Sequence, residues 1–163
     1  RDCTSINLSS LQEVSVQLLQ VLLSPNIQFL DLNGVTELSD QLANVFSTRN
    51  TPIFLSLNSV RSISVEQAQH LIQCGLPSPS TGTLSLKGIC EINPNVAEIL
   101  SQYQGLNLSL NKDAICDAHS KAALASNSKI RFQSEQFNLV TFGLILLRLN
   151  HSSVIYLLFP SIK

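Results

Sequence analysis

One short pattern of alternating aliphatic residues occurs five times in this chain of 163 residues, and it constrains the fold more than any other feature. Successive copies begin 24, 25, 29 and 24 residues apart. A repeat of this length is one supersecondary unit that cannot bury its apolar side alone and must stack on its neighbours. The copies begin at Ile6, Leu30, Leu55, Leu84 and Leu108.

The clearest copy, at residues 30–35, reads LDLNGV and predicts a short strand that ends in a turn. Alternation places Leu30 and Leu32 on one face of the chain and the residues between them on the other, as in a half-buried strand. Gly34 is a small residue that breaks the strand, and Val35 then returns to the apolar side. Ser59 and Gly88 stand where Gly34 does, so the turn is expected in the next two copies as well.

A residue that can cap a helix stands nine positions after the start of every copy. Ser, Asn and Asp side chains accept hydrogen bonds from the free amides of a helix's first turn. Pro94 occupies a first helical position, and Ser64 with Gln67 matches a capping box. Apolar residues four and seven positions after the cap continue as a helical stripe in the first four copies. Helices are therefore predicted directly after Ser15, Ser39, Ser64, Asn93 and Asp117.

Each copy is thus interpreted as a strand, a turn and a helix, with all the strands parallel. The inward positions of the strand and turn should merge into one continuous core. They are Leu32, Val35, Leu38, Leu57, Val60, Ile63, Leu86, Ile89 and Ile92.

With five Leu-x-Leu-like starts and five aligned caps, the chain resembles the leucine-rich repeat family over residues 6–126. It is most similar to a bacterial-type variant with Leu-x-Leu-x-Gly-Val/Leu strands and Ser-capped helices. The resemblance implies an α/β solenoid with a parallel sheet on its concave face and helices on its convex face. Val35, Val60 and Ile89 stand where the commonest pattern has an asparagine, so the usual buried asparagine ladder is not expected.

Charge and cysteine content exclude several classes of protein. Charged residues make up 13% of the chain, against about 25% in typical domains, and the net charge is −1. No basic patch is visible, so a nucleic-acid partner is not expected. The four cysteines are too few and too scattered for a disulfide scaffold.

The chain divides into a repeat region at residues 1–136, with about five repeats, and an apolar C-terminal segment at 137–163. The segment is interpreted as a cap over the last repeat, because the ends of stacked repeats need cover. Arg148, Asn150 and His151 interrupt it, so a membrane span is not expected. Residues 76–82 read LPSPSTG and are interpreted as a surface loop inserted into the third repeat. Because residue 1 is Arg and no apolar signal core lies near it, we expect a fragment or processed piece of a longer protein.

No catalytic or cofactor motif stands out. Glycine-rich phosphate loops, Gly-x-Ser-x-Gly elbows and His-Glu-x-x-His motifs are missing from the sequence. His70 and Cys74 lie one helical turn apart, but zinc needs more ligands than these two. Residues 117–120 contain Asp, His and Ser, which on one helix cannot converge as a catalytic triad. Neither enzymatic activity nor a cofactor or metal is therefore expected.

The expected binding surface is the concave side of the sheet. Phe29 and Phe54 precede the strand starts of adjacent repeats, and strand alternation places both rings on that side. Either they fold under the rim, or they form an aromatic anchor that dominates affinity while polar residues set orientation. The candidate partner-binding residues are Phe29, Asp31, Asn33, Phe54, Ser56, Asn58, Ser85, Lys87, Ser109 and Asn111.

Three functions are compatible with these features. The leading one is a non-catalytic module that binds a protein partner on its concave sheet. The alternatives are a structural or spacer segment without a ligand, and an accessory recognition region of an enzyme whose catalytic domain lies outside these residues. The family resemblance supports the first, although function is set by sites rather than by folds.

Overall fold

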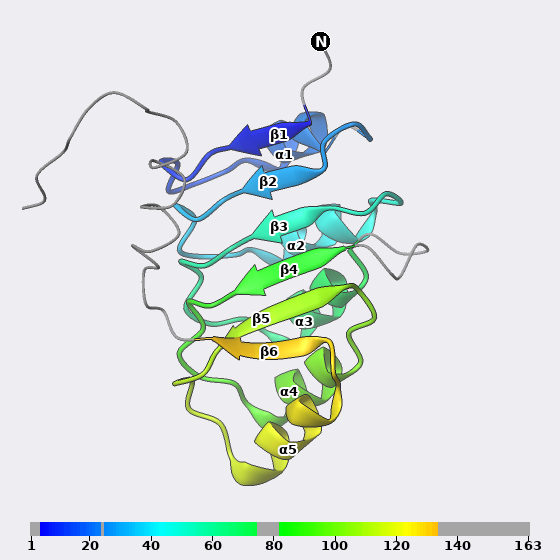
Figure 1. Ribbon diagram of the computed structural model, residues 1–163. Helices are drawn as coiled ribbons and strands as arrows, with labels where there is room; N and C mark the ends of the chain where they lie inside the picture. The colour runs from blue at the N-terminus through cyan, green and yellow to red at the C-terminus, as the bar shows by residue number, and fades with distance from the viewer. Residues whose placement is uncertain (1–3, 24, 75–81, 134–163) are drawn as a thin grey trace, which may run out of the picture.

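The computed structural model describes residues 4–23, 25–74 and 82–133, in which strands and helices alternate. Six strands form one parallel sheet in the order of the sequence, and Figure 1 shows the helices layered behind it. The strands are β1 (Ser5–Asn7), β2 (Phe29–Asp31), β3 (Phe54–Ser56), β4 (Thr83–Leu86), β5 (Asn107–Asn111) and β6 (Ile130–Gln133). The helices are α1 (Val16–Leu22), α2 (Asp40–Ser47), α3 (Val65–Ile72), α4 (Pro94–Ser101) and α5 (Ala118–Ser126).

The predicted parallel strands are confirmed, and each begins one residue before the predicted start. The starting aliphatic residues pair across the whole sheet, from Ile6 beside Leu30 to Leu108 beside Ile130. The pairing of Leu84 with Leu108 fixes the register of the fifth strand. The sixth strand, at Ile130–Gln133, follows α5 and adds one strand to the five repeated starts, at a stretch where the sequence also allows a strand.

All five predicted caps are confirmed. In each, the side chain accepts a hydrogen bond from the backbone N–H three residues later, over 2.9–3.2 Å. Gln67 completes the capping box, since its Oε1 accepts from the Ser64 N–H at 3.0 Å. Pro94 occupies the first turn of α4 as predicted. Such caps contribute about 1 kcal/mol each, so the cap column defines where every helix begins.

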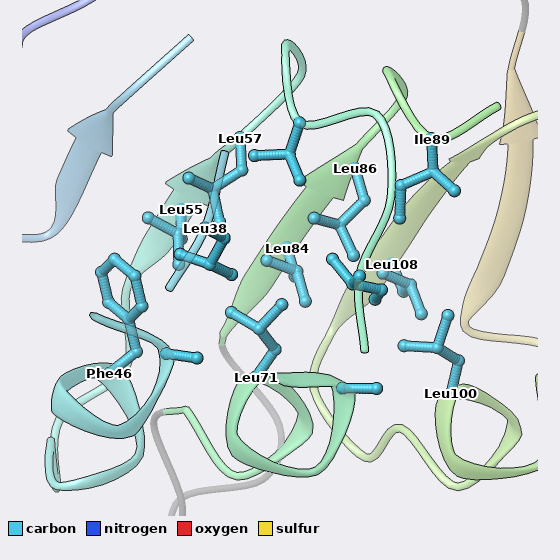
Figure 2. Close-up of a cluster of buried hydrophobic side chains, with 14 of the residues drawn as sticks. Leu38, Phe46, Leu55, Leu57, Leu71, Leu84, Leu86, Ile89, Leu100 and Leu108 are labelled. Atoms are coloured by element: carbon cyan, nitrogen blue, oxygen red, sulfur yellow. The ribbon is translucent and has the colours of Figure 1, made fainter. Parts of the chain in front are cut away.

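The nine predicted core positions are all buried and belong to one apolar cluster that runs through the stacked units. Figure 2 shows Leu55 and Leu84 on the side of their strands that faces the helices, close to the helix residues Phe46 and Leu71. The helices contribute Phe46, Leu71 and Leu100 at the predicted position seven residues after the cap, and Leu124 at the same position of α5, whereas the predicted Leu22 is half-buried. Alternating strand residues and one helical stripe therefore make a single core between the two layers.

Two of the turn glycines are required by the close approach of neighbouring units. A Cβ atom on Gly34 would collide with the backbone carbonyl oxygens of Ser9 and Leu11 in the preceding unit. A Cβ atom on Gly88 would collide with the carbonyls of Asn58 and Val60 in the same way. The small residue that the sequence places after the strand thus allows one turn to rest directly on the backbone of the turn before it.

At the ends of the strands opposite to these turns, buried polar side chains form hydrogen bonds with the helix-to-strand connections. Arg49 donates from Nε to the Thr51 carbonyl at 3.0 Å and from its guanidinium to the Ile27 carbonyl, and burial lowers its pKa. The Tyr103 hydroxyl donates to the Gly82 carbonyl at 2.9 Å, and burial raises its pKa. These bonds link the connections to one another, and the Gly82 carbonyl also accepts from the Leu106 backbone N–H at 2.6 Å.

The predicted apolar segment at residues 137–163 lies outside the described residues, as does the surface loop at 76–82 apart from Gly82. The interpretations of these two segments, and the division of the chain at residue 136, stay predictions. The strands and helices at 5–133 belong to one sheet and its helical layer.

Candidate functional site on the open face of the sheet

The face of the sheet that points away from the helices is called the open face here. Leu30 and Leu55 point into the core, so their strand neighbours Phe29, Asp31, Phe54 and Ser56 lie on the open face. A flat parallel sheet would normally be covered on both faces. The side chains on this open face are therefore the first place to look for a binding function.

The two phenylalanines form one aromatic pair. Phe29 is the register partner of Phe54, and the rings stack with centroids 4.7 Å apart and an angle of 16° between their planes. Phe54 is 37% exposed and Phe29 is half-buried. The prediction that these rings are adjacent is confirmed. Neighbouring parallel strands hold them together because the same position in each repeat falls at the same height in the sheet.

A hollow of about 610 Å³ opens beside Phe54. Its walls come from the connections that lead into β2, β3 and β4, and they are mixed in polarity. The lining residues are Pro25, Gln28, Thr51, Pro52, Ile53, Phe54 and Thr83. Phe54 of the aromatic pair thus forms one wall of this hollow.

The polar side chains of the open face differ from the aromatic pair, because they form hydrogen bonds with one another across the strands. Asn33 Oδ1 accepts from the Ser56 hydroxyl at 2.8 Å and from the Asn58 N–H at 2.9 Å. One strand further on, Asn58 Oδ1 accepts from the Ser85 hydroxyl at 2.7 Å and from the Lys87 N–H at 3.1 Å. We call this arrangement the Asn–Ser ladder.

The Asn–Ser ladder does not extend over every strand. Lys87 stands in the asparagine column of the fourth unit and has no oxygen to accept the next pair of hydrogen bonds. In the fifth unit Asn111 Oδ1 accepts from the Asp113 N–H at 3.0 Å, within its own turn. In the first unit Ser9 stands in this column, and its backbone N–H donates to Asn7 Oδ1 at 2.9 Å. The ladder therefore links the second, third and fourth units.

The structure places the ten predicted site residues at different depths. Phe54 is exposed, whereas Phe29, Asp31, Asn33, Asn58 and Lys87 are half-buried. Ser56, Ser85 and Ser109 are each 4% exposed, and Asn111 is 8% exposed. The serines thus lie below the accessible surface, and the reachable part of the predicted site is the aromatic pair with the half-buried residues beside it.

Sequence reasoning placed these asparagines and serines on the concave side of the sheet, but it did not predict the hydrogen bonds between them that make the Asn–Ser ladder. The sequence did contain a signal for it. A serine that can donate a hydrogen bond, Ser56, stands two residues before an asparagine that can accept one, Asn58, and Asn33 stands at the position of Asn58 in the preceding repeat. It was interpreted as a binding surface because the sequence alone does not give the exposure of side chains. Arg49 and Tyr103 were not singled out either, since they stand outside the repeated columns.

The other polar residues that could have formed a site were also examined for their contacts in the fold. Asp117 caps α5, and hydrogen bonds from Ser120 are the main reason that its pKa is lowered. His70 Nε2 lies 4.0 Å from Glu66 Oε1 on α3, and desolvation raises the pKa of the Cys74 thiol to about 12. Cys90 and Cys116 are free thiols. In the described part of the chain, no three His, Cys, Asp or Glu side chains gather in a way that could hold a metal ion.

Comparison of the chain with models of known protein families, with curated proteins and with solved structures finds no match. Of the helices in the described ranges, none has the length and apolar character needed to cross a bilayer.

Proposed function

We propose that this protein is a non-catalytic protein-interaction module of the leucine-rich repeat type, which binds a partner on the open face of its sheet. In this proposal the stacked units form a solenoid, with the open face concave and the helices on the convex side. The repeated starts, the aligned caps and the parallel sheet in sequence order support the solenoid. The stacked, accessible Phe29–Phe54 pair is the observation that carries the binding function.

The aromatic pair is the expected source of affinity. Burying an exposed apolar side chain contributes about 1.5–3 kcal/mol, and a neutral hydrogen bond adds about 1 kcal/mol net. Two rigid rings held in contact lose little conformational freedom when a partner covers them, as is typical of interface hot spots. The hollow beside Phe54 gives an apolar side chain of the partner a place to insert.

Electrostatic attraction should play a small part in this binding. Asp31 is the one charged residue in β2 and β3, and the chain as a whole has a net charge of −1. Salt screens interactions between exposed charges but leaves apolar burial nearly unchanged. Affinity should therefore change little between low and physiological ionic strength.

The proposal is tested by binding measurements on Phe29→Ala and Phe54→Ala. A partner is isolated with the immobilised protein, and its dissociation constant is measured by calorimetry for the parent and each variant. We expect each substitution to weaken binding about tenfold or more, since 1.4 kcal/mol corresponds to a factor of ten. Ile115→Ala is the matched control, because Ile115 is a 73% exposed aliphatic residue in the connection between β5 and α5, outside the six strands.

If both phenylalanine variants keep the circular dichroism spectrum of the parent and bind with unchanged affinity, the aromatic pair is not the binding site. If Ile115→Ala weakens binding as much as the phenylalanine variants do, the site is not confined to the open face.

A further inference from the structure

One position in the helix-to-strand connections links successive units through side chains of different types. It lies 19 residues after the aliphatic residue that starts each strand, and we call it the connection column. The Tyr103 hydroxyl donates to the Gly82 carbonyl of the preceding connection at 2.9 Å, and Asn127 Nδ2 donates to the Tyr103 carbonyl at 2.9 Å. In the second to fifth units the column contains Arg49, Cys74, Tyr103 and Asn127.

Arg49 is the charged member of the connection column, and it is buried, with 5% of its surface exposed. Nε donates to the Thr51 carbonyl at 3.0 Å within its own connection, and the guanidinium also donates to the Ile27 carbonyl of the preceding one. A buried charge costs free energy unless hydrogen bonds compensate for the lost water. Arg49 therefore holds two connections at once, the one that leads into β2 and the one that leads into β3.

These two connections lead directly to the aromatic pair. Ile27 stands two residues before Phe29, and Thr51 stands three residues before Phe54. Phe29 and Phe54 are the first residues of β2 and β3, so each has the sheet on one side and its connection on the other. The backbone bond from the Phe54 N–H to the Gln28 carbonyl, at 2.8 Å, lies beside the two carbonyls that Arg49 binds. The relative placement of the two rings therefore depends on how these connections are held.

The contact between the rings is sensitive to such placement. Aromatic pairs favour a limited set of offsets, and here the centroids are 4.7 Å apart with 16° between the planes. The same two connections supply lining residues of the hollow beside Phe54, among them Gln28, Thr51 and Pro52. A shift of one connection against the other would change both the stacking of the rings and the shape of the hollow.

We propose that Arg49 is the positioning residue of the aromatic pair, which it holds in its stacked arrangement by binding the Ile27 and Thr51 carbonyls. A guanidinium suits this role because its planar group presents several donors in fixed directions. The inference rests on the proposed function in one respect, namely that the pair it positions is the binding site. Asn127 provides a comparison, because it links the connections into β5 and β6, and neither of these strands carries a member of the pair.

The test is NMR spectroscopy of the whole chain with isotope-labelled phenylalanine rings. The chain has seven phenylalanines, and Phe29→Leu and Phe54→Leu assign the two rings. The parent should show nuclear Overhauser effects between the rings. Arg49→Met keeps the aliphatic stem and removes the donors, so it should lose these effects while keeping the circular dichroism spectrum of the parent. Asn127→Ala is the matched control, which should lower the melting temperature and leave the effects between the rings intact.

A second variant covers the case in which Arg49→Met does not fold. Arg49→Lys keeps the positive charge but lacks the planar fork of donors, so its effects between the rings should be weaker than those of the parent. A folded Arg49→Met with the ring contacts of the parent would overturn the proposal. So would parental contacts in Arg49→Lys where Arg49→Met is unfolded, or a loss of contacts in Asn127→Ala as complete as that in Arg49→Met.

Failure of the binding proposal would be recognised separately. If the ring contacts depend on Arg49 while Phe29→Ala and Phe54→Ala bind the isolated partner like the parent, the positioning role of Arg49 is supported and the binding site lies elsewhere.

Discussion

The Phe29–Phe54 pair and the Asn–Ser ladder lie on the same open face, but they differ in exposure and in hydrogen bonding. The phenylalanines stack on each other and leave Phe54 exposed, whereas Ser56 and Ser85 are buried and donate hydrogen bonds to Asn33 and Asn58. The hydrogen-bonding capacity of the ladder is thus largely used within the protein. We infer that the ladder holds the units in register and that the aromatic pair is available to a partner.

The largest effect should follow from a change in the core beneath both regions. Leu57 is fully buried between the sheet and the helices (Figure 2). Leu57→Ala should lower the free energy of unfolding by about 2–5 kcal/mol, because a large-to-small change in a packed core loses burial and leaves a cavity. Denaturant titration measures this loss, and a value under about 1 kcal/mol would mean that this column is not core.

A smaller loss of stability is expected when the ladder is cut. Asn58→Ala removes the oxygen that accepts from the Ser85 hydroxyl and the Lys87 N–H, and it removes a donor to Ser56 Oγ at 3.0 Å. Leaving buried groups without partners costs about 1–3 kcal/mol. Asn58→Asp is the matched control, because it keeps the acceptor oxygen and should recover part of the loss in a thermal melt. Equal melting temperatures for Asn58→Ala and the parent would show that the ladder does not hold the units together.

The smallest effect on stability is expected at the aromatic pair. Phe54 is partly solvent-exposed, so Phe54→Ala forfeits the stacking contact, worth about 0.5–1.5 kcal/mol, and little core packing. Its free energy of unfolding should stay within about 1.5 kcal/mol of the parent in the same titration. A loss as large as that of Leu57→Ala would show that the ring supports the fold instead of being available for binding.

The elements that follow from local chemistry could be predicted from the sequence. The cap at Ser39 and the turn at Gly34 depend on residues within a few positions, and the repeated columns made the parallel register visible. The depth of Ser56 and the exposure of Val21 could not be predicted, because each depends on the presence of a neighbouring unit. Residues at the same repeat position are buried in one unit and exposed in another, although the repeated sequence pattern is the same in both units.

The most direct test of the account measures stability and affinity together on two variants of the open face. The double variant Phe29→Ala/Phe54→Ala should lose about a hundredfold in affinity for the isolated partner while remaining folded. Asn58→Ala should show the reverse, with a lowered free energy of unfolding and an unchanged dissociation constant below its melting temperature. If the folded double variant binds like the parent, or if Asn58→Ala loses affinity without losing stability, the division of the open face into a binding pair and a structural ladder is contradicted.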